Sequence, residues 1–140
     1  MLFKTAVIIG LVILIILGVT LLVDFRNNRF TDKQIVQNIH VQNKKLPEML
    51  DKSTELTSII YGDDMIVYNY RMIKYDVSEI DVEQFHRQIR QKLLKKICST
   101  QSLKAYFANG IVFSHNYNDK NGNDVKDIII THKDCIELKM

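Results

Sequence analysis

The stretch MIVYNYRMIKYDVSEIDVEQFHRQIRQKLLKKIC, residues 65–98, decides the fold, because the spacing of its apolar residues changes half-way along. At positions 66–72 an apolar or aromatic side chain occurs at every second residue, which predicts a half-buried β-strand. At positions 82–97 apolar residues recur every three or four places, which predicts an amphipathic helix with Ser78 or Asp81 as its cap. A strand is therefore followed directly by a long helix.

The segments on either side of this stretch also have regular patterns. Turn residues at 62–64 and at Asn121-Gly122 separate pairs of strands, and Asn109-Gly110 predicts the end of a second helix. The predicted elements are strands at 54–61 and 66–72, helices within 78–98 and 99–110, and strands at 111–117 and 125–131, with a brief extra pairing at Met49-Leu50. Two strand pairs around a helical pair are typical of an α+β domain. We expect a four-stranded, mostly antiparallel sheet with two helices packed on one face, in the order β-β-α-α-β-β.

The N-terminal segment has the composition of a membrane span. Residues 5–23, TAVIIGLVILIILGVTLLV, carry no charge, and as a helix they would be about 28 Å long, close to the thickness of the hydrocarbon core of a bilayer. This run is longer than the apolar core of a cleavable signal peptide, and neither an A-x-A pattern nor a cysteine directly follows it. We therefore predict a single uncleaved span, with a cleaved signal peptide as the alternative.

A linker connects this span to the domain. Thr31 followed by Gln34 forms a capping-box pattern ahead of a short apolar stripe, so we expect a helix over residues 32–43 that serves as a stalk. The expected regions are a transmembrane anchor at 1–24, a linker with the stalk helix at 25–45, and the α+β domain at 46–140.

The charge balance excludes one class of partner. The chain has 19 Lys and Arg against 16 Asp and Glu, a formal net charge of +3, whereas nucleic-acid binding calls for a strong face of one sign. Basic residues nevertheless follow the outer side of the two predicted helices: Arg87, Arg90, Lys92, Lys95, Lys96 and Lys104. This basic face is either simply solvated or a contact for anionic lipid headgroups or an acidic partner, because such charges contribute about 1 kcal/mol each near a membrane.

The chain has two cysteines, Cys98 at the end of the long helix and Cys135 after the last strand. A disulfide between them would tie the sheet edge to the helix layer, and closing a loop of 37 positions would stabilise the domain by roughly 4 kcal/mol. Two free thiols are the alternative. A structural disulfide persists in an oxidising compartment, so the pair and the anchor together predict a bacterial inner-membrane protein whose domain faces the periplasm.

The C-terminal sequence THKDC, residues 131–135, also raises the question of a reactive cysteine or a metal site. If the last strand continues through it, His132 lies on the opposite face from Cys135, so no Cys–His pair is expected. The four histidines fall on four different predicted elements and no C-x-x-C motif is present, so we expect no metal and no other cofactor. The turn at 119–124 lacks the glutamate of a calcium loop and is interpreted as a plain hairpin turn.

The order of several short motifs resembles small, mostly uncharacterised envelope domains of proteobacteria. The matching positions, which span about 95 residues, are Leu46-Pro47, Asp51, Thr54, Tyr68, Tyr70, Cys98, Asn109-Gly110, Asp119, Gly122 and Asp134-Cys135. The resemblance implies an exported, disulfide-bonded α+β domain and no activity. Secretion-system pilotins are similar in size and location, but they are lipoproteins, and this chain has no cysteine at the end of its apolar segment.

These features lead to one functional hypothesis and one main alternative. We expect a non-enzymatic, single-pass membrane protein whose periplasmic domain binds another envelope protein or helps to assemble a complex. The alternative is a periplasmic immunity protein that neutralises an imported toxin. A hydrolase would require a deep polar pocket with paired carboxylates, and the turn aspartates Asp63-Asp64 do not predict one.

Overall fold

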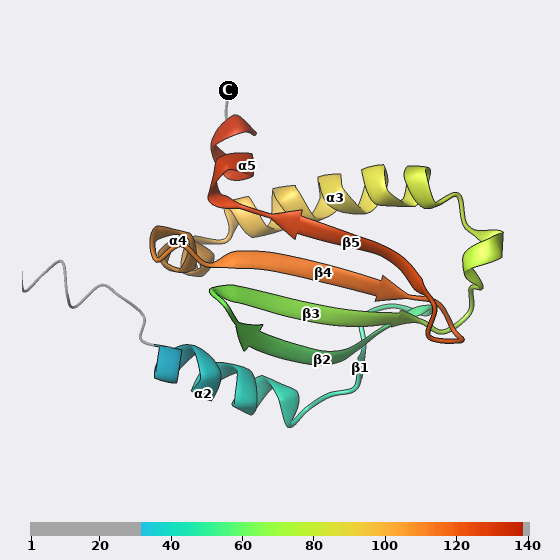
Figure 1. Ribbon diagram of the computed structural model, residues 1–140, viewed down its shortest axis with the longest axis horizontal. Coiled ribbons are helices and arrows are strands. Elements are labelled where there is room, and N and C mark those ends of the chain that lie inside the picture. Colours follow the sequence, from blue (N-terminus) through green and yellow to red (C-terminus); the bar gives the residue numbers. More distant parts are fainter. Residues whose placement is uncertain (1–31, 139–140) are drawn as a thin grey trace, which may run out of the picture.

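The computed structural model describes residues 32–138, which form a single sheet flanked by helices (Figure 1). The elements in chain order are α2 (Asp32–Asn43), β1 (Glu48–Met49), β2 (Thr54–Gly62), β3 (Met65–Met72), the short 3-10 helix η1 (Val77–Glu79), α3 (Val82–Ser99), α4 (Gln101–Ala108), β4 (Val112–Asn118), β5 (Asp124–Ile130) and α5 (His132–Glu137).

The sheet has five strands in the order β1-β2-β3-β4-β5, which confirms the α+β class. The expected count of four strands is wrong, because the two-residue β1 adds a short edge strand beside β2. The sheet is also mixed: β3 and β4 pair in parallel, whereas the other three pairs are antiparallel. The expectation of two helices is wrong as well, since α2 and α5 also belong to the described domain.

The parallel pairing of β3 and β4 follows from the lengths of the elements between them. α3 has 18 residues and is therefore about 27 Å long, which matches the roughly 26 Å of β3 with its 8 residues. One pass of α3 returns the chain to the end of the sheet where β3 begins, and α4 turns it into β4 (Figure 1). β4 must then run in the same direction as β3.

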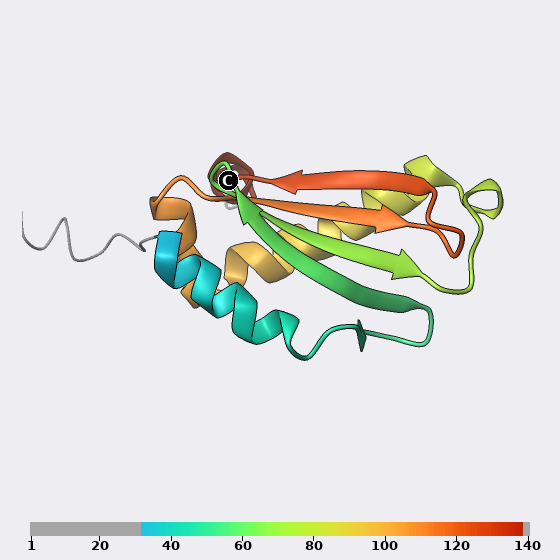
Figure 2. The ribbon, with the colours of Figure 1, turned by 60° about the horizontal axis from the view of Figure 1, so that its bottom comes forward.

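α2 and α3 pack on the same face of the sheet. Figure 2 shows α3 running behind the strands, and α2 contacts β2 while α3 contacts β5. α2 forms at the expected residues and buries Ile35 and Ile39 in the core shared with the sheet, with Ile35 only 1% exposed. The stalk interpretation of this helix is therefore wrong, because the helix packs against the domain.

The alternation of β3 decides which face of the sheet is buried. Ile66, Tyr70 and Met72 point into the core, whereas Arg71 is exposed on the other face. Ile66 lies beside Phe113 of β4 in the parallel register, and such cross-strand rows fill the core. No helix of residues 32–138 covers the opposite face, which we call the open face and which faces the reader in Figure 1.

The turns form where the sequence predicts them. Asp63 and Asp64 both have positive φ, 50° and 56°, so the two-residue β2–β3 loop has the backbone twist that suits a tight hairpin. Gly110 after α4 has φ 80° and Gly122 in the β4–β5 turn has φ 87°, both in the left-handed region that glycine adopts without a Cβ clash.

The predicted anchor at 1–24 lies outside the described residues. Among helices formed by residues 32–138, none combines the length and apolar character needed to cross a bilayer. Membrane anchoring therefore stays a prediction from the sequence.

Candidate functional site

The two cysteines form a disulfide. Sγ of Cys98 and Sγ of Cys135 are 1.94 Å apart, and the Cα atoms are 5.2 Å apart. Cys98 lies in the last turn of α3, and Cys135 lies in α5 rather than in an extended tail. The predicted bond is confirmed, and it joins two helices at one end of the sheet.

The short helix α5 begins at a capping box. The Thr131 backbone N–H and hydroxyl donate to one carboxylate oxygen of Asp134 at 2.8 and 2.7 Å, and Nη2 of Arg90 donates to the other oxygen at 2.5 Å. Burial opposes ionisation of Asp134, but these hydrogen bonds outweigh it and hold the pKa of its carboxyl below the usual value. The Asp134 carboxylate thus connects the start of α5 to α3.

A pocket of about 400 Å³ lies beside the disulfide, between the end of α3, α4 and α5. Its walls are mostly apolar, and the lining residues are Ile97, Cys98, Lys104, Phe107, Ala108, His132, Cys135 and Ile136. The His132 ring stacks on Phe107 with centroids 5.8 Å apart. His132 and Lys104 are exposed, so two basic side chains border an apolar cavity.

The structure corrects the expected geometry of His132 and Cys135. They lie three positions apart in a helix, not in a strand, so both contribute to the same pocket. Cys135 is bonded to Cys98 and has no thiol to act as a nucleophile. Over residues 32–138, no group of three or more His, Cys, Asp or Glu side chains is arranged to hold a metal ion.

Five of the six residues of the predicted basic face are exposed. Arg87, Lys92, Lys95 and Lys96 are exposed on α3, and Lys104 is exposed on α4. Arg90 differs, because its guanidinium donates to the Ile129 carbonyl oxygen at 2.8 Å and to Asp134. Arg90 therefore holds α3 to β5 and α5, and the role of the other five residues in partner contact stays a prediction.

A stack of aromatic rings lies on the buried face of the sheet, formed by Tyr68 and Tyr70 of β3 and His115 and Tyr117 of β4. His115 is 4% exposed, and its Nδ1 lies 2.9 Å from the Tyr70 hydroxyl. Burial, with a smaller contribution from the charge of Lys96, lowers the pKa of His115 to about 4, and burial raises the pKa of Tyr70. The direction of this hydrogen bond depends on the tautomer of His115, and Nε2 of His115 has no hydrogen-bond partner among the described residues.

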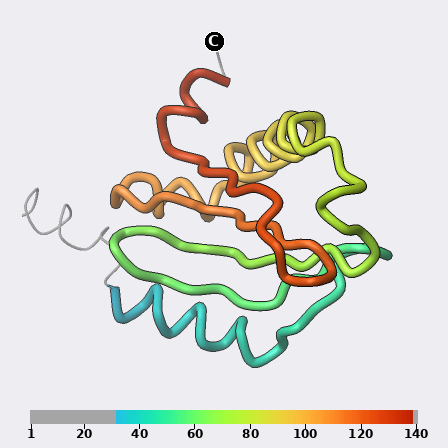
Figure 3. Tube along the Cα trace, turned by 45° about the vertical axis from the view of Figure 1, so that its right-hand side comes forward, coloured from blue at the N-terminus to red at the C-terminus, as the bar shows by residue number. Residues whose placement is uncertain are grey.

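Asp119 anchors the β4–β5 turn to the segment that follows β3, and these two segments lie side by side in Figures 1 and 3. Its fully buried carboxylate accepts hydrogen bonds from the backbone N–H groups of Val77, Asn121 and Asn123 at 3.0, 2.8 and 2.9 Å, and from the Asn123 side chain at 2.9 Å. Burial opposes ionisation, but these four donors lower the pKa of Asp119 to about 2. The hairpin prediction is confirmed; the link to Val77 was missed, although an Asp followed closely by Asn-Gly-Asn indicates an Asx-type turn.

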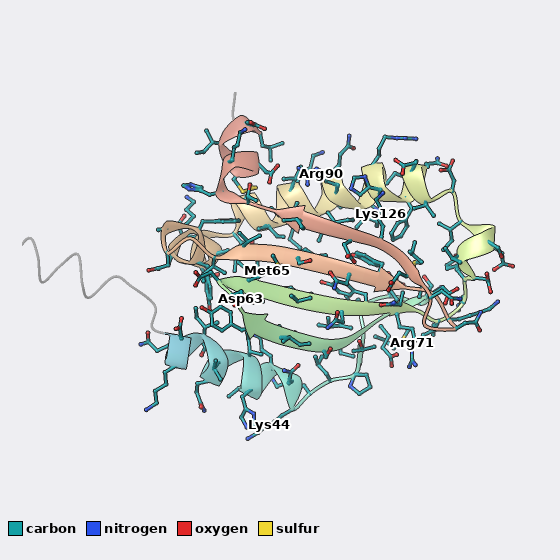
Figure 4. All side chains as sticks on the ribbon, viewed as in Figure 1. Lys44, Asp63, Met65, Arg71, Arg90 and Lys126 are labelled. Carbon is teal, nitrogen blue, oxygen red and sulfur yellow. A yellow bond between two sulfur atoms is a disulfide. The ribbon has the colours of Figure 1, made fainter. Side chains whose placement is uncertain are left out.

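The open face divides into an apolar and a polar half. One cross-strand row runs from Ile60 through Val67 and Ser114 to Ile129, with Ile60 56% and Ile129 47% exposed. Met65 lies one step from this row toward the β2–β3 turn, and Arg71 marks the polar half; Figure 4 labels both. On the polar half the Asn69 amide donates to Ser58 at 2.9 Å, and Arg71 pairs with Glu55 at 2.6 Å. We call the cross-strand row of Ile60, Val67, Ser114 and Ile129 the apolar row.

No family model and no curated protein sequence matches this chain. Solved structures do match it. A predicted secreted protein from Pseudomonas aeruginosa is similar with a TM-score of 0.63 at 12% identity, covering 74% of this chain and 90% of that one. EpsS, a pilotin of the type 2 secretion system of Vibrio vulnificus, is similar with a TM-score of 0.58 at 13% identity, covering 71% and 86%. AspS, a type II secretion system pilotin of Vibrio cholerae, is similar with a TM-score of 0.54 at 12% identity, again covering 71% and 86%.

These structural similarities establish the fold. Sequence identities of 12% and 13% are too low to assign a function. The described domain has the α+β fold found in a predicted secreted protein and in two secretion-system pilotins. The membrane anchor, the proteobacterial origin and the periplasmic location remain predictions.

Proposed function

We propose that this chain is a non-enzymatic, single-pass membrane protein, held in the inner membrane by residues 1–24, whose periplasmic domain binds another envelope protein or helps to assemble it. The observation that carries the proposal is the fold, which the described residues share with type II secretion system pilotins from two Vibrio species. The disulfide supports the periplasmic location, because a cytosolic thiol pair is kept reduced.

The apolar row is the surface that suits a protein partner best. Isolated exposed apolar residues are common, but Ile60, Val67 and Ile129 lie in one cross-strand row on a face without helices. The two exposed isoleucines stand at the ends of this row, with the half-buried Val67 and the buried Ser114 between them. Exposed apolar side chains that gather on one face typically mark an interaction site. The exposed lysines of α3 offer a second contact for an acidic partner.

Side chains already bind backbone groups at both edges of the sheet, which favours a partner that docks on a face. Arg90 donates to the Ile129 carbonyl oxygen at the β5 edge, and the Asn43 amide binds the N–H and carbonyl of Ile59 at the β2 edge. A partner that added a strand would have to displace these side chains. We therefore expect side-chain contacts with the apolar row.

Site-specific photocrosslinking in intact cells tests the proposal. A photoreactive amino acid replaces Ile60 or Ile129 in the full chain, and the captured proteins are identified by mass spectrometry. The matched control carries the same amino acid at Val36, which is 52% exposed on α2. A probe at Lys92 reports on the basic face.

We expect one envelope protein to be captured from positions 60 and 129 and not from position 36. The double change Ile60→Asp and Ile129→Asp should weaken its co-purification about tenfold or more, because a charge in a desolvated apolar contact costs more than 1.4 kcal/mol. Capture of no defined partner, or of the same proteins from position 36, would contradict the proposal. Capture from position 92 alone would show that the partner binds the basic face and not the apolar row.

A further inference from the structure

The pocket beside the disulfide has the size and the walls of a small-ligand site. Its volume of about 400 Å³ corresponds to on the order of a dozen water molecules and lies in the lower part of the range for ligand sites. Ile97, Phe107 and Ile136 give it an apolar lining next to the Cys98–Cys135 bond. Water in such a cavity finds few polar partners, so an apolar group gains by displacing it.

The charges around the pocket leave a surplus of positive charge at its border. No Asp or Glu is among the lining residues. The two acids of α5 already have partners: Asp134 binds Arg90, and Oε1 of Glu137 lies 3.7 Å from Nζ of Lys133. Lys104 forms no ion pair within the described part of the chain. The pocket therefore suits a ligand with an apolar tail and an anionic head.

The pocket lies at the end of the domain where the described chain begins. Figures 1 and 2 both place α4, α5 and the start of α2 at the same end of the long axis. Eight residues, 24–31, separate the predicted span from α2, and fully extended they reach about 28 Å. With the proposed anchor, the start of α2 lies within about 28 Å of the bilayer, so the pocket end is the end of the domain that the linker holds nearest to lipids with an acyl tail and an anionic head.

We infer that this pocket binds one acyl chain of an anionic lipid, with Lys104 and His132 contacting the head. The source is either a phospholipid of the adjacent bilayer or a free fatty acid, since both present an acyl tail and an anionic group. The bilayer source rests on the proposed membrane anchoring; the free fatty acid does not.

Photolabelling of the full chain in nanodiscs distinguishes the two sources. In one arm the nanodiscs contain phosphatidylglycerol with a diazirine on its acyl chain; in the other, a diazirine fatty acid is added to unlabelled nanodiscs. We expect labelled peptides that contain residues 104–108 or 132–136. Ala108→Trp, which fills the pocket from an exposed position, should reduce this labelling about tenfold, and Lys104→Glu should reduce it roughly threefold to tenfold.

Lys92→Glu is the matched control, because Lys92 is an exposed lysine of α3 that does not line the pocket, and its labelling should equal that of the unchanged chain. Non-reducing electrophoresis verifies that each variant retains its disulfide. Labelling confined to other segments, or unaffected by Ala108→Trp, overturns the inference. Capture of a protein segment in this pocket without lipid labelling also overturns it. The proposed function is tested separately, since Ile60→Asp and Ile129→Asp change the partner contact and leave the pocket intact.

Discussion

The side-chain amide of Asn43 binds the backbone of Ile59 as a neighbouring strand would. Nδ2 donates to the Ile59 carbonyl oxygen at 2.7 Å, and Oδ1 accepts from the Ile59 N–H at 2.9 Å. Ile59 lies beyond the part of β2 that pairs with β1, so its outward backbone groups have no strand partner. The last residue of α2 thus protects the sheet edge, where open backbone groups would recruit another strand.

Replacing Asn43 by Ala should lower the free energy of unfolding by about 1–3 kcal/mol, because two backbone groups lose their hydrogen bonds. Urea unfolding followed by circular dichroism measures the loss. Size-exclusion chromatography should reveal oligomers if the open edge pairs with a strand of another molecule. Asn38→Ala is the control: Asn38 is exposed on the same helix and should change stability by less than about 0.5 kcal/mol. Equal effects of the two changes would rule out the edge role.

Arg90 should be more important for stability than its neighbours on the basic face. Arg90→Ala removes the bonds to Ile129 and Asp134 and should destabilise the domain by about 1–3 kcal/mol. Arg90→Lys should recover only part of this, because an ammonium lacks the planar fork that reaches both acceptors. Arg87→Ala, at an exposed position three residues earlier, should be nearly neutral. An Arg87 effect as large as that of Arg90 would contradict this assignment.

The disulfide should stabilise the domain by about 4 kcal/mol, as loop closure over 37 positions implies. α5 has only 6 residues, too few for an independent helix, so it should unfold first when the bond is reduced. Urea unfolding with and without dithiothreitol measures the effect. The double variant Cys98→Ser and Cys135→Ser should match the reduced protein and should not respond to the reductant. If thiol alkylation in freshly lysed cells modifies both cysteines, the periplasmic location is wrong.

Stability should fall as the pH decreases from about 6.5 to 4, through His115. The folded state holds His115 neutral with a pKa near 4, whereas the unfolded chain takes up a proton near 6.5, so protonation favours unfolding over this window. The full effect is on the order of 3 kcal/mol. Urea midpoints between pH 7.5 and 4 measure it. His115→Phe combined with Tyr70→Phe, which leaves no unpaired hydroxyl, should flatten the profile, and an unchanged slope would refute the assignment.

Asp119 should contribute stability above pH 3.8 that is lost as the pH falls toward 2. Its folded pKa of about 2 lies below the usual value of 3.8, so the unfolded state binds the proton first. Asp119→Asn should lower the melting temperature at pH 7, because an amide presents an NH2 group to backbone donors, and it should remove this acid dependence. Asp127→Asn changes an exposed aspartate of β5 and should do neither. A similar shift for both variants would show that Asp119 has no special role.

At the candidate site, the disulfide could be predicted from the sequence, whereas the pocket beside it could not. Two cysteines leave one possible intrachain bond, so the pairing was predictable. The pocket beside it was not, because the segment after β5 was taken as extended when Thr131 and Asp134 in fact start a helix. That helix turns His132 toward the side of Cys135, which an extended chain would not do.

The sequence by itself determined the identity and order of the main elements: helices with a period near 3.6, strands with a period of two, and turns at Asp63-Asp64 and Asn121-Gly122. Such patterns arise between residues at most a few positions apart, and they can be read without a fold. Only the tertiary structure decided that β3 and β4 run parallel, that Asn43 reaches Ile59 across 16 positions, and that Asp119 binds Val77 across 42. These contacts depend on how the finished elements pack, because the partner of a side chain far along the sequence is set by the geometry of the whole domain and not by its neighbours in the chain.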